Sequence, residues 1–99
     1  MTTTRNEILN VTARAFGVNT WNLISRGRDA NTALARQVAM YLILQNDCDC
    51  TLREAGETVG GRCPATVLHA YNKIAGRKNS DPRVRGLLER IENLLGKSG

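Results

Sequence analysis

The most informative segment of this chain, residues 60–70, reads Gly60-Gly61-Arg62-Cys63-Pro64-Ala65-Thr66-Val67-Leu68-His69-Ala70. Two adjacent glycines allow a tight turn, because glycine tolerates backbone angles that other residues avoid. Pro64 suits the first turn of a following helix, where its missing N–H would have no partner anyway. A short helix, a glycine turn and a second helix form a helix-turn-helix, which places its second helix in a DNA groove.

The second helix of this motif is predicted to have one apolar and one polar face. Four residues recur at helical spacing and should face the core: Val67, Ala70, Tyr71 and Ile74. The outer side would then carry Arg62, Ala65, Thr66, His69 and Lys73. No acidic residue occurs from residue 64 to residue 78, so this surface would not repel phosphates.

The helical pattern alone is equally typical of a plain hairpin of two helices packed in a bundle. The charges favour the DNA-binding interpretation. Arg53 lies on the first helix and Arg62 in the turn, and Lys73 and Arg77 follow along the second helix. We therefore take the motif as the leading candidate for a nucleic-acid contact.

Helical signals continue ahead of the turn. The capping box Thr51-Leu52-Arg53-Glu54 starts the first helix of the pair, whose inner face would be Leu52, Ala55 and Val59. A longer helix is predicted over residues 29–45, and its second half, residues 38–44, is apolar on nearly every side. Such a helix belongs at the centre of a small bundle.

Both ends of the chain are also predicted to be helical. A capping box at residues 4–7 starts a helix that stops near Gly17, and Asn19 caps a short helix, with Trp21 and Ile24, that ends near Gly27. Asp81-Pro82 starts a final helix with an apolar stripe of Val84, Leu87, Leu88, Ile91, Leu94 and Leu95, which is expected to close a core rather than lie on a membrane. The prediction is an all-α fold, a small helical bundle with a helix-turn-helix. It would form one domain over residues 1–99, with its core at about 4–96.

The composition agrees with a single basic domain. Ninety-nine residues are enough for one modest core, not for a catalytic domain plus a binding domain, so we expect no enzyme. The net charge is +5, from 14 Lys+Arg against 9 Asp+Glu. This balance favours a polyanionic partner, either nucleic acid or an anionic membrane surface, with ordinary solubilising charge as the alternative.

No apolar run is long enough to span a bilayer, and no signal peptide follows Met1. We expect a monomer in the cytoplasm, associated with the nucleoid and not inserted in a membrane. Cys48, Cys50 and Cys63 would then be reduced thiols. With His69 they could hold zinc, but their spacing matches no standard zinc motif, so we expect no metal. The chain has no phosphate-binding loop, and we expect no cofactor.

A second basic feature, Ser25-Arg26-Gly27-Arg28, precedes the long helix. Arginines on a connector can enter the narrow minor groove of DNA, where the negative potential is focused. A solvated loop that carries two charges is the alternative. Arg26 and Arg28 therefore join the candidate DNA contacts.

Several spaced segments, taken in order, point to one family. They are Ser25-Arg26-Gly27-Arg28, residues 35–42 (ARQVAMYL), residues 51–56 (TLREAG), residues 60–62 (GGR) and residues 66–70 (TVLHA). In these segments the chain resembles the C-terminal DNA-binding domain, domain IV, of the bacterial chromosomal replication initiator DnaA. The similarity runs from about Ile8 to Leu95. The resemblance implies an all-α bundle related to the Trp repressor, with a helix-turn-helix in its C-terminal half.

The resemblance also implies roles for single residues. Arg28 matches the arginine that reads the minor groove, and Arg62 and His69 match the arginine and the later histidine of the signature. Others fall at or beside positions that hold the DNA backbone or reach bases. The expected DNA-binding residues are Arg26, Arg28, Arg36, Gln37, Thr51, Arg53, Arg62, Ala65, Thr66, His69 and Lys73.

The chain departs from the family where the second helix begins. Members usually have Asp-His-Thr-Thr where this chain has Cys63-Pro64-Ala65-Thr66, and the Asp and His take part in reading bases in the major groove. A thiol, a ring without an N–H and a methyl group cannot reproduce those contacts. Resemblance and departure together predict binding of double-stranded DNA, in initiation or regulation of DNA replication, with altered or relaxed sequence preference.

The same departure supports an alternative from a different class. A protein-interaction or transcription-regulatory module could keep the fold and lose recognition of the initiator's origin box. Its partner would be a replication initiator or another regulatory protein.

Overall fold

The computed structural model describes residues 4–25, 29–46 and 49–96. Within these ranges every regular element is a helix: α1 (Arg5–Phe16), α2 (Thr20–Ile24), α3 (Ala30–Asn46), α4 (Leu52–Thr58), α5 (Pro64–Ser80) and α6 (Pro82–Leu94). The prediction of an all-α fold is confirmed. None of these helices, over the residues described, is long and apolar enough to cross a membrane.

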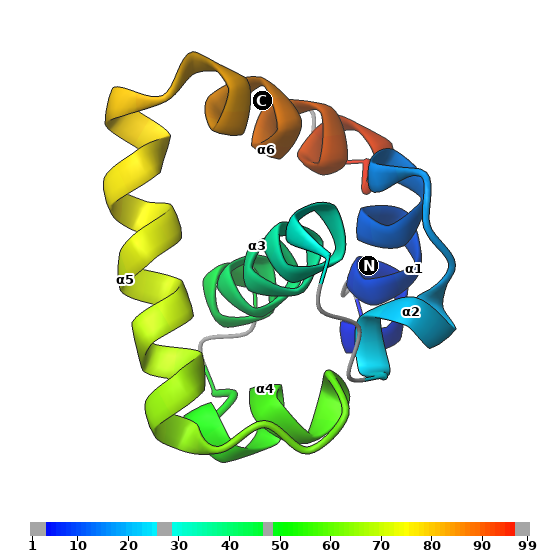
Figure 1. Ribbon diagram of the computed structural model, residues 1–99, viewed down its shortest axis with the longest axis vertical. Coiled ribbons are helices and arrows are strands. Elements are labelled where there is room, and N and C mark those ends of the chain that lie inside the picture. Colours follow the sequence, from blue (N-terminus) through cyan, green and yellow to red (C-terminus); the bar gives the residue numbers. More distant parts are fainter. Residues whose placement is uncertain (1–3, 26–28, 47–48, 97–99) are drawn as a thin grey trace.

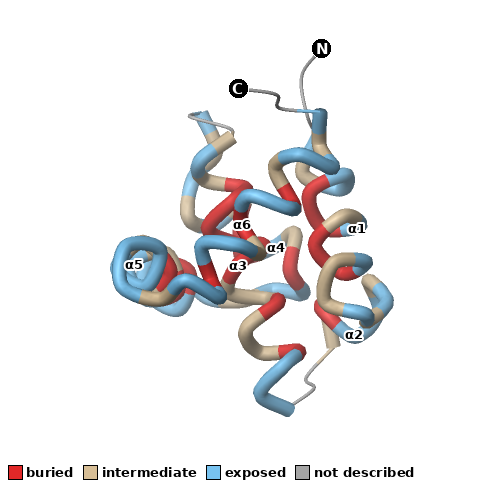
Figure 2. Tube along the Cα trace, turned by 90° about the horizontal axis from the view of Figure 1, so that it is seen from above, coloured by how far each residue is buried: buried red, intermediate tan, exposed pale blue. Residues whose placement is uncertain are grey.

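Helix α3 lies at the centre of the bundle, and the other helices surround it (Figure 1). Its residues 38–43 are all buried, which is what a helix apolar on every side requires. In Figure 2 the buried parts of the outer helices face this interior. The carboxylate of Asp29 marks the start of α3, because it accepts hydrogen bonds from the Thr32 N–H at 3.0 Å and the Thr32 hydroxyl at 2.9 Å.

Side-chain caps fix where the other helices begin. At Thr51 the capping box is complete, since the hydroxyl accepts from the Glu54 N–H and the Glu54 carboxylate accepts from the Thr51 N–H. At Thr4 the structure shows the hydroxyl half of the predicted box, accepting from the Glu7 N–H at 3.1 Å. Asn19 caps α2 as predicted, through the Asn22 N–H at 2.9 Å.

The helix-turn-helix consists of α4, a turn over residues 59–63, and α5. Gly60 and Gly61 have φ angles of 92° and 81°, in the left-handed region that favours glycine. The N–H groups of Gly61 and Arg62 both donate to the Gly56 carbonyl at 2.9 Å, which closes the turn. Pro64 is the first residue of α5, as predicted. The same helix buries Val67, Ala70 and Ile74 against the core.

Helix α5 is joined to α3 by polar as well as apolar contacts. The rings of Tyr41 and Tyr71 pack with their centroids 5.1 Å apart and their planes tilted by 30°. The Gln45 side-chain amide donates to both hydroxyls, at 3.2 Å to Tyr41 and 3.1 Å to Tyr71. Because Tyr71 lies in the middle of α5, these contacts fix how that helix crosses the central one.

Two predictions at helix ends are wrong. Helix α2 ends at Ile24 rather than near Gly27, because the backbone of Ser25 is already extended. The apolar stripe predicts that Leu94 is buried on α6, but the residue is 51% exposed. At 100° per residue it lies roughly 90° from the centre of the buried stripe. The single tryptophan, Trp21, is also mostly outside the core, at 70% exposure.

Candidate functional site

A crevice runs between α3 and α5 and consists of two adjacent hollows. The first, of about 130 Å³, is lined by Ala33, Arg36, Gln37, Met40, Arg62, Thr66, His69 and Ala70. The second, of about 320 Å³, is lined by Ala30, Ala33, Leu34, Gln37, Lys73 and Arg77. Of the described residues that line this α3–α5 crevice, four are Arg or Lys and none is acidic. The crevice therefore suits a negatively charged ligand.

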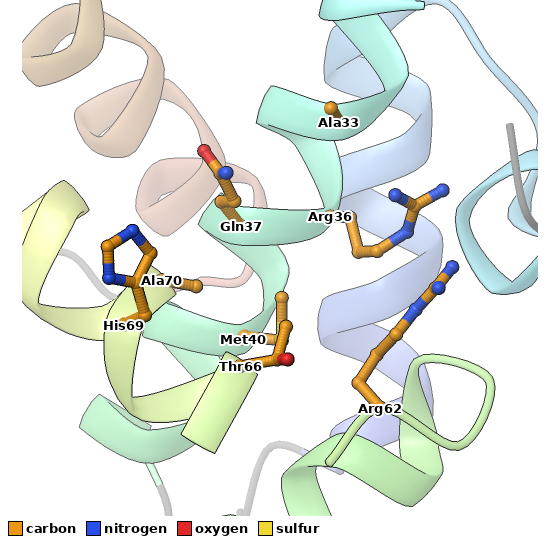
Figure 3. Close-up of a pocket in the computed structure, with 8 residues that line it drawn as sticks. All are labelled: Ala33, Arg36, Gln37, Met40, Arg62, Thr66, His69 and Ala70. Atoms are coloured by element: carbon orange, nitrogen blue, oxygen red, sulfur yellow. The ribbon is translucent and has the colours of Figure 1, made fainter. Parts of the chain in front are cut away.

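Six of the predicted DNA-binding residues meet in this crevice, although they come from three different segments. They are Arg36, Gln37, Arg62, Thr66, His69 and Lys73. Figure 3 shows that the guanidinium groups of Arg36 and Arg62 extend toward the same side of the first hollow, whereas Gln37 and His69 lie on its other side. The site is thus built where α5 crosses the first half of α3.

The N-terminal half of α5 offers an exposed polar face beside the crevice. Ala65, Thr66 and His69 are exposed, as the periodicity predicts, while the neighbouring Val67 and Ala70 are buried. We call Ala65, Thr66 and His69 the recognition face. Lys73 continues the same side of the helix one turn later and is half-buried. The face carries donors and a methyl group but no carboxylate.

Thr51 and Arg53 lie at the start of α4 and do not line the crevice. The Thr51 hydroxyl is engaged as the helix cap, where it accepts from the Glu54 N–H at 3.1 Å. Arg53 forms an ion pair with Glu57 at 3.4 Å, with both side chains largely in solvent. Exposed ion pairs of this kind contribute little to the stability of the fold. A phosphate could therefore replace Glu57 as the partner of Arg53.

The two arginines of the first hollow also bind the protein's own backbone. Arg36 donates from Nε to the Leu23 carbonyl at 2.9 Å and from Nη2 to the Ser25 carbonyl at 3.0 Å. Arg62 donates from Nη2 to the same Ser25 carbonyl at 2.7 Å and from Nε to the Val59 carbonyl at 3.3 Å. Burial lowers the pKa of Arg36, and the neighbouring positive charge of Arg62 lowers it further. Sequence reasoning assigned both to DNA and missed these contacts.

The start of α5, residues 63–65, is exposed and lacks the usual cap. Cys63 is the N-cap residue but makes no side-chain capping hydrogen bond. Its sulfur instead lies 3.0 Å from the Thr66 hydroxyl oxygen. That contact lowers the pKa of the Cys63 thiol. The tip, as we call residues 63–65, therefore presents a thiol, a proline ring and a methyl group to its surroundings.

Some of the predicted residues cannot be placed. Arg26, Arg28 and Cys48 lie outside the described residues. In the part of the chain that the structure describes, no three His, Cys, Asp or Glu side chains are grouped so as to hold a metal ion. Arg77, which the basic pattern of α5 indicates but which is not among the expected DNA-binding residues, also lines the second hollow.

Comparison with known proteins identifies a family for most of the chain. The model of the family described as "Bacterial dnaA protein helix-turn-helix" matches residues 5–74. The matched region includes α3, the whole turn and the recognition face.

Individual relatives agree with that match. The chromosomal replication initiator protein DnaA of Herpetosiphon aurantiacus is 42% identical over 92 residues, which are 93% of this chain and 19% of the relative. The DnaA of Roseiflexus castenholzii is 38% identical over 92 residues, again 93% and 19%. That of a Streptococcus pyogenes M4 strain is 39% identical over 89 residues, 90% of this chain and 20% of the relative. The chain thus spans about a fifth of the length of these relatives.

Proposed function

The chain belongs to the bacterial DnaA helix-turn-helix family, and from that premise we propose that it binds double-stranded DNA through α4 and α5. The observation that carries the proposal is the recognition face of α5 beside the basic, acid-free lining of the α3–α5 crevice. The relatives are chromosomal replication initiator proteins, which supports a role in initiation or regulation of DNA replication. Such a role would be carried out at the nucleoid, in the cytoplasm, by a monomer.

In the proposed complex, α5 enters the major groove and phosphates lie along the crevice. Lys73 and Arg77 at one end would neutralise phosphate charges, and Arg36 and Arg62, whose guanidinium groups bond backbone carbonyls, would add positive potential at the other. Each neutralised phosphate releases condensed counterions, so affinity should fall steeply as salt rises. Arg28, on the connector that follows Ser25, would enter the adjacent minor groove.

In the proposed complex, the preference for particular DNA sequences would differ from that of the relatives. The tip offers a thiol, which hydrogen-bonds weakly, and two side chains with no polar group. Thr66 has a hydroxyl, but it already contacts the Cys63 sulfur at 3.0 Å. Base edges opposite the tip would meet few donors or acceptors, and each lost base contact removes roughly 1–3 kcal/mol of discrimination. Altered or relaxed preference is therefore part of the proposal.

The direct test is a selection of bound duplexes from a random pool, followed by fluorescence anisotropy on the selected sequence. We expect binding at low salt with a linear fall of log K against log salt, and a slope of about −0.9 for each phosphate contact. A scrambled duplex of equal length measures the specificity ratio. Absence of binding to any duplex at low salt would contradict the proposal.

One observation favours a second function, that of a protein-interaction module. The tip is exposed and carries little hydrogen-bonding chemistry, although a base-reading helix normally begins with polar side chains. Such a module would bind a replication initiator or another regulatory protein. Binding to a purified DnaA protein, together with no affinity for duplex DNA, would favour this function over the first.

A further inference from the structure

The last turn of α2 is covered by residues that come from α3 and from the helix-turn-helix. The final carbonyls of any helix lack partners within the helix. Here the Leu23 carbonyl accepts from Arg36, and the Ser25 carbonyl accepts from both Arg36 and Arg62. The negative end of the helix dipole adds to the attraction for these two cations.

Between those two carbonyls, the backbone of Gly60 packs directly against Ile24. A Cβ atom added to Gly60 would clash with the Ile24 carbonyl oxygen. Gly56 holds the other side of the turn in the same way, because a Cβ there would clash with the Arg62 carbonyl. The turn is therefore seated on the end of α2 by backbone contact as well as by the arginines.

These contacts connect two parts of the proposed DNA-binding surface. Residue 62 is two positions before the start of α5, and residue 25 is the last one before the basic connector. Helix α2 packs mainly on α1 and α3. The seat on α2 adds to this packing a direct link between the last residue before the connector and the residues that lead into α5.

We propose that Arg36 and Arg62 are positioning residues that fix the end of α2 against the turn, so that connector and recognition helix meet DNA at a set separation. The inference rests on the proposed function and deepens it. A positioning role and a direct phosphate contact require different properties of the guanidinium group. A phosphate needs a positive charge, whereas the Ser25 and Val59 carbonyls are held together by the fork of Nε and Nη2 on Arg62.

The decisive variant is Arg62→Lys, which keeps the charge and removes the fork. We expect the affinity ratio of selected to scrambled duplex to fall about tenfold, while the slope of log K against log salt stays as in the wild type. Arg62→Lys with a wild-type ratio, together with a slope lowered by about 0.9 in Arg62→Ala, would overturn the inference in favour of a phosphate contact. Arg36→Lys tests the contact with the Ser25 carbonyl from the side of α3, and it should also lower the affinity ratio of selected to scrambled duplex. Arg85→Lys on the exposed side of α6 is the matched control.

A double-mutant cycle separates positioning from a general loss of structure. If Arg62 acts on the connector, then Arg62→Lys should have much less effect on the specificity ratio when Arg28 is already Ala. Full additivity would overturn the inference, because a merely weakened fold would affect both backgrounds equally. Circular dichroism must show each variant folded at the assay temperature.

The two proposals fail in distinguishable ways. A wild-type chain that binds no duplex contradicts the proposed function and the positioning role with it. A wild-type chain that binds, with an Arg62→Lys variant that matches it, contradicts the positioning role alone.

Discussion

The turn and the tip are neighbours in sequence, but they differ in what holds them. Residues 60–62 pack against the end of α2 and donate backbone hydrogen bonds to α4, two of them to the Gly56 carbonyl. Residues 63–65 are exposed and make few contacts. Substitution in the turn therefore disturbs the fold, whereas substitution in the tip changes the surface offered to a partner. A change of side chains at the tip is therefore compatible with an unchanged fold.

The largest expected effect is in the turn. Gly60→Ala combines a left-handed φ with a clash against the Ile24 carbonyl, and should lower the free energy of unfolding by about 3 kcal/mol. Gly61→Ala is the matched control, since its φ is similar but a Cβ there would meet nothing within 4 Å. It should cost only about 1 kcal/mol. Urea unfolding followed by circular dichroism measures both, and equal losses would show that the seat on α2 contributes nothing.

The tip should show the opposite behaviour, with a large effect on specificity and a small one on stability. Replacing Cys63 by Asp, Pro64 by His and Ala65 by Thr introduces the polar side chains that the resemblance to the family leads us to expect at these positions. We expect preference for the initiator's usual box to rise about tenfold or more, because each recovered base contact adds discrimination. Anisotropy with matched and scrambled duplexes measures it. An unchanged preference would mean that contacts beyond the tip have diverged as well.

The cations of the second hollow should affect affinity without affecting specificity. Lys73→Ala removes one cation from the second hollow, so binding should weaken equally for all duplexes and the salt slope should shrink by about 0.9. Arg85→Ala, on α6, removes the same charge away from the crevice and should leave the slope unchanged. A Lys73→Ala variant that alters the specificity ratio would place that side chain against a base instead.

The smallest effect concerns the thiol at the tip. Contact with the Thr66 hydroxyl lowers the pKa of Cys63, which means that its thiolate forms at lower pH than that of an ordinary cysteine. Alkylation by iodoacetamide should therefore begin at lower pH in the wild type than in Thr66→Val. The measurement should be made in a variant that also carries Cys48→Ser and Cys50→Ser, so that Cys63 is the thiol that reacts. Identical pH profiles would show that the sulfur–hydroxyl contact does not exist in solution.

Local signals in the sequence were sufficient for most of the fold. The apolar run at 38–44 indicated the central helix, the capping box at Thr51 indicated the start of α4, and Pro64 indicated the start of α5. Each depends on residues within one or two helical turns of one another. The exposure of Leu94 was not predictable from periodicity. Periodicity gives the direction in which a side chain leaves the helix, but not how much of the helix the packed neighbours cover.

The candidate site was predictable only in part. Periodicity correctly separated exposed Thr66 and His69 from buried Val67 and Ala70. The contacts of Arg62 were not foreseeable, because its acceptor on Ser25 is 37 positions away. The space around Gly60 likewise depends on Ile24, on a different helix. A motif in the sequence identified the turn but gave no indication of the surface against which it packs.

Trp21 gives the chain a built-in optical reporter. It is the single tryptophan, it is 70% exposed, and it lies on α2, whose last turn seats the helix-turn-helix. Because the indole is already in water in the folded state, its emission should shift little on global unfolding, and fluorescence would be a poor measure of stability. The same exposure leaves it accessible to quenchers in solution. Quenching by acrylamide, measured with and without duplex, therefore reports whether a duplex docks close to this part of α2, without any attached dye.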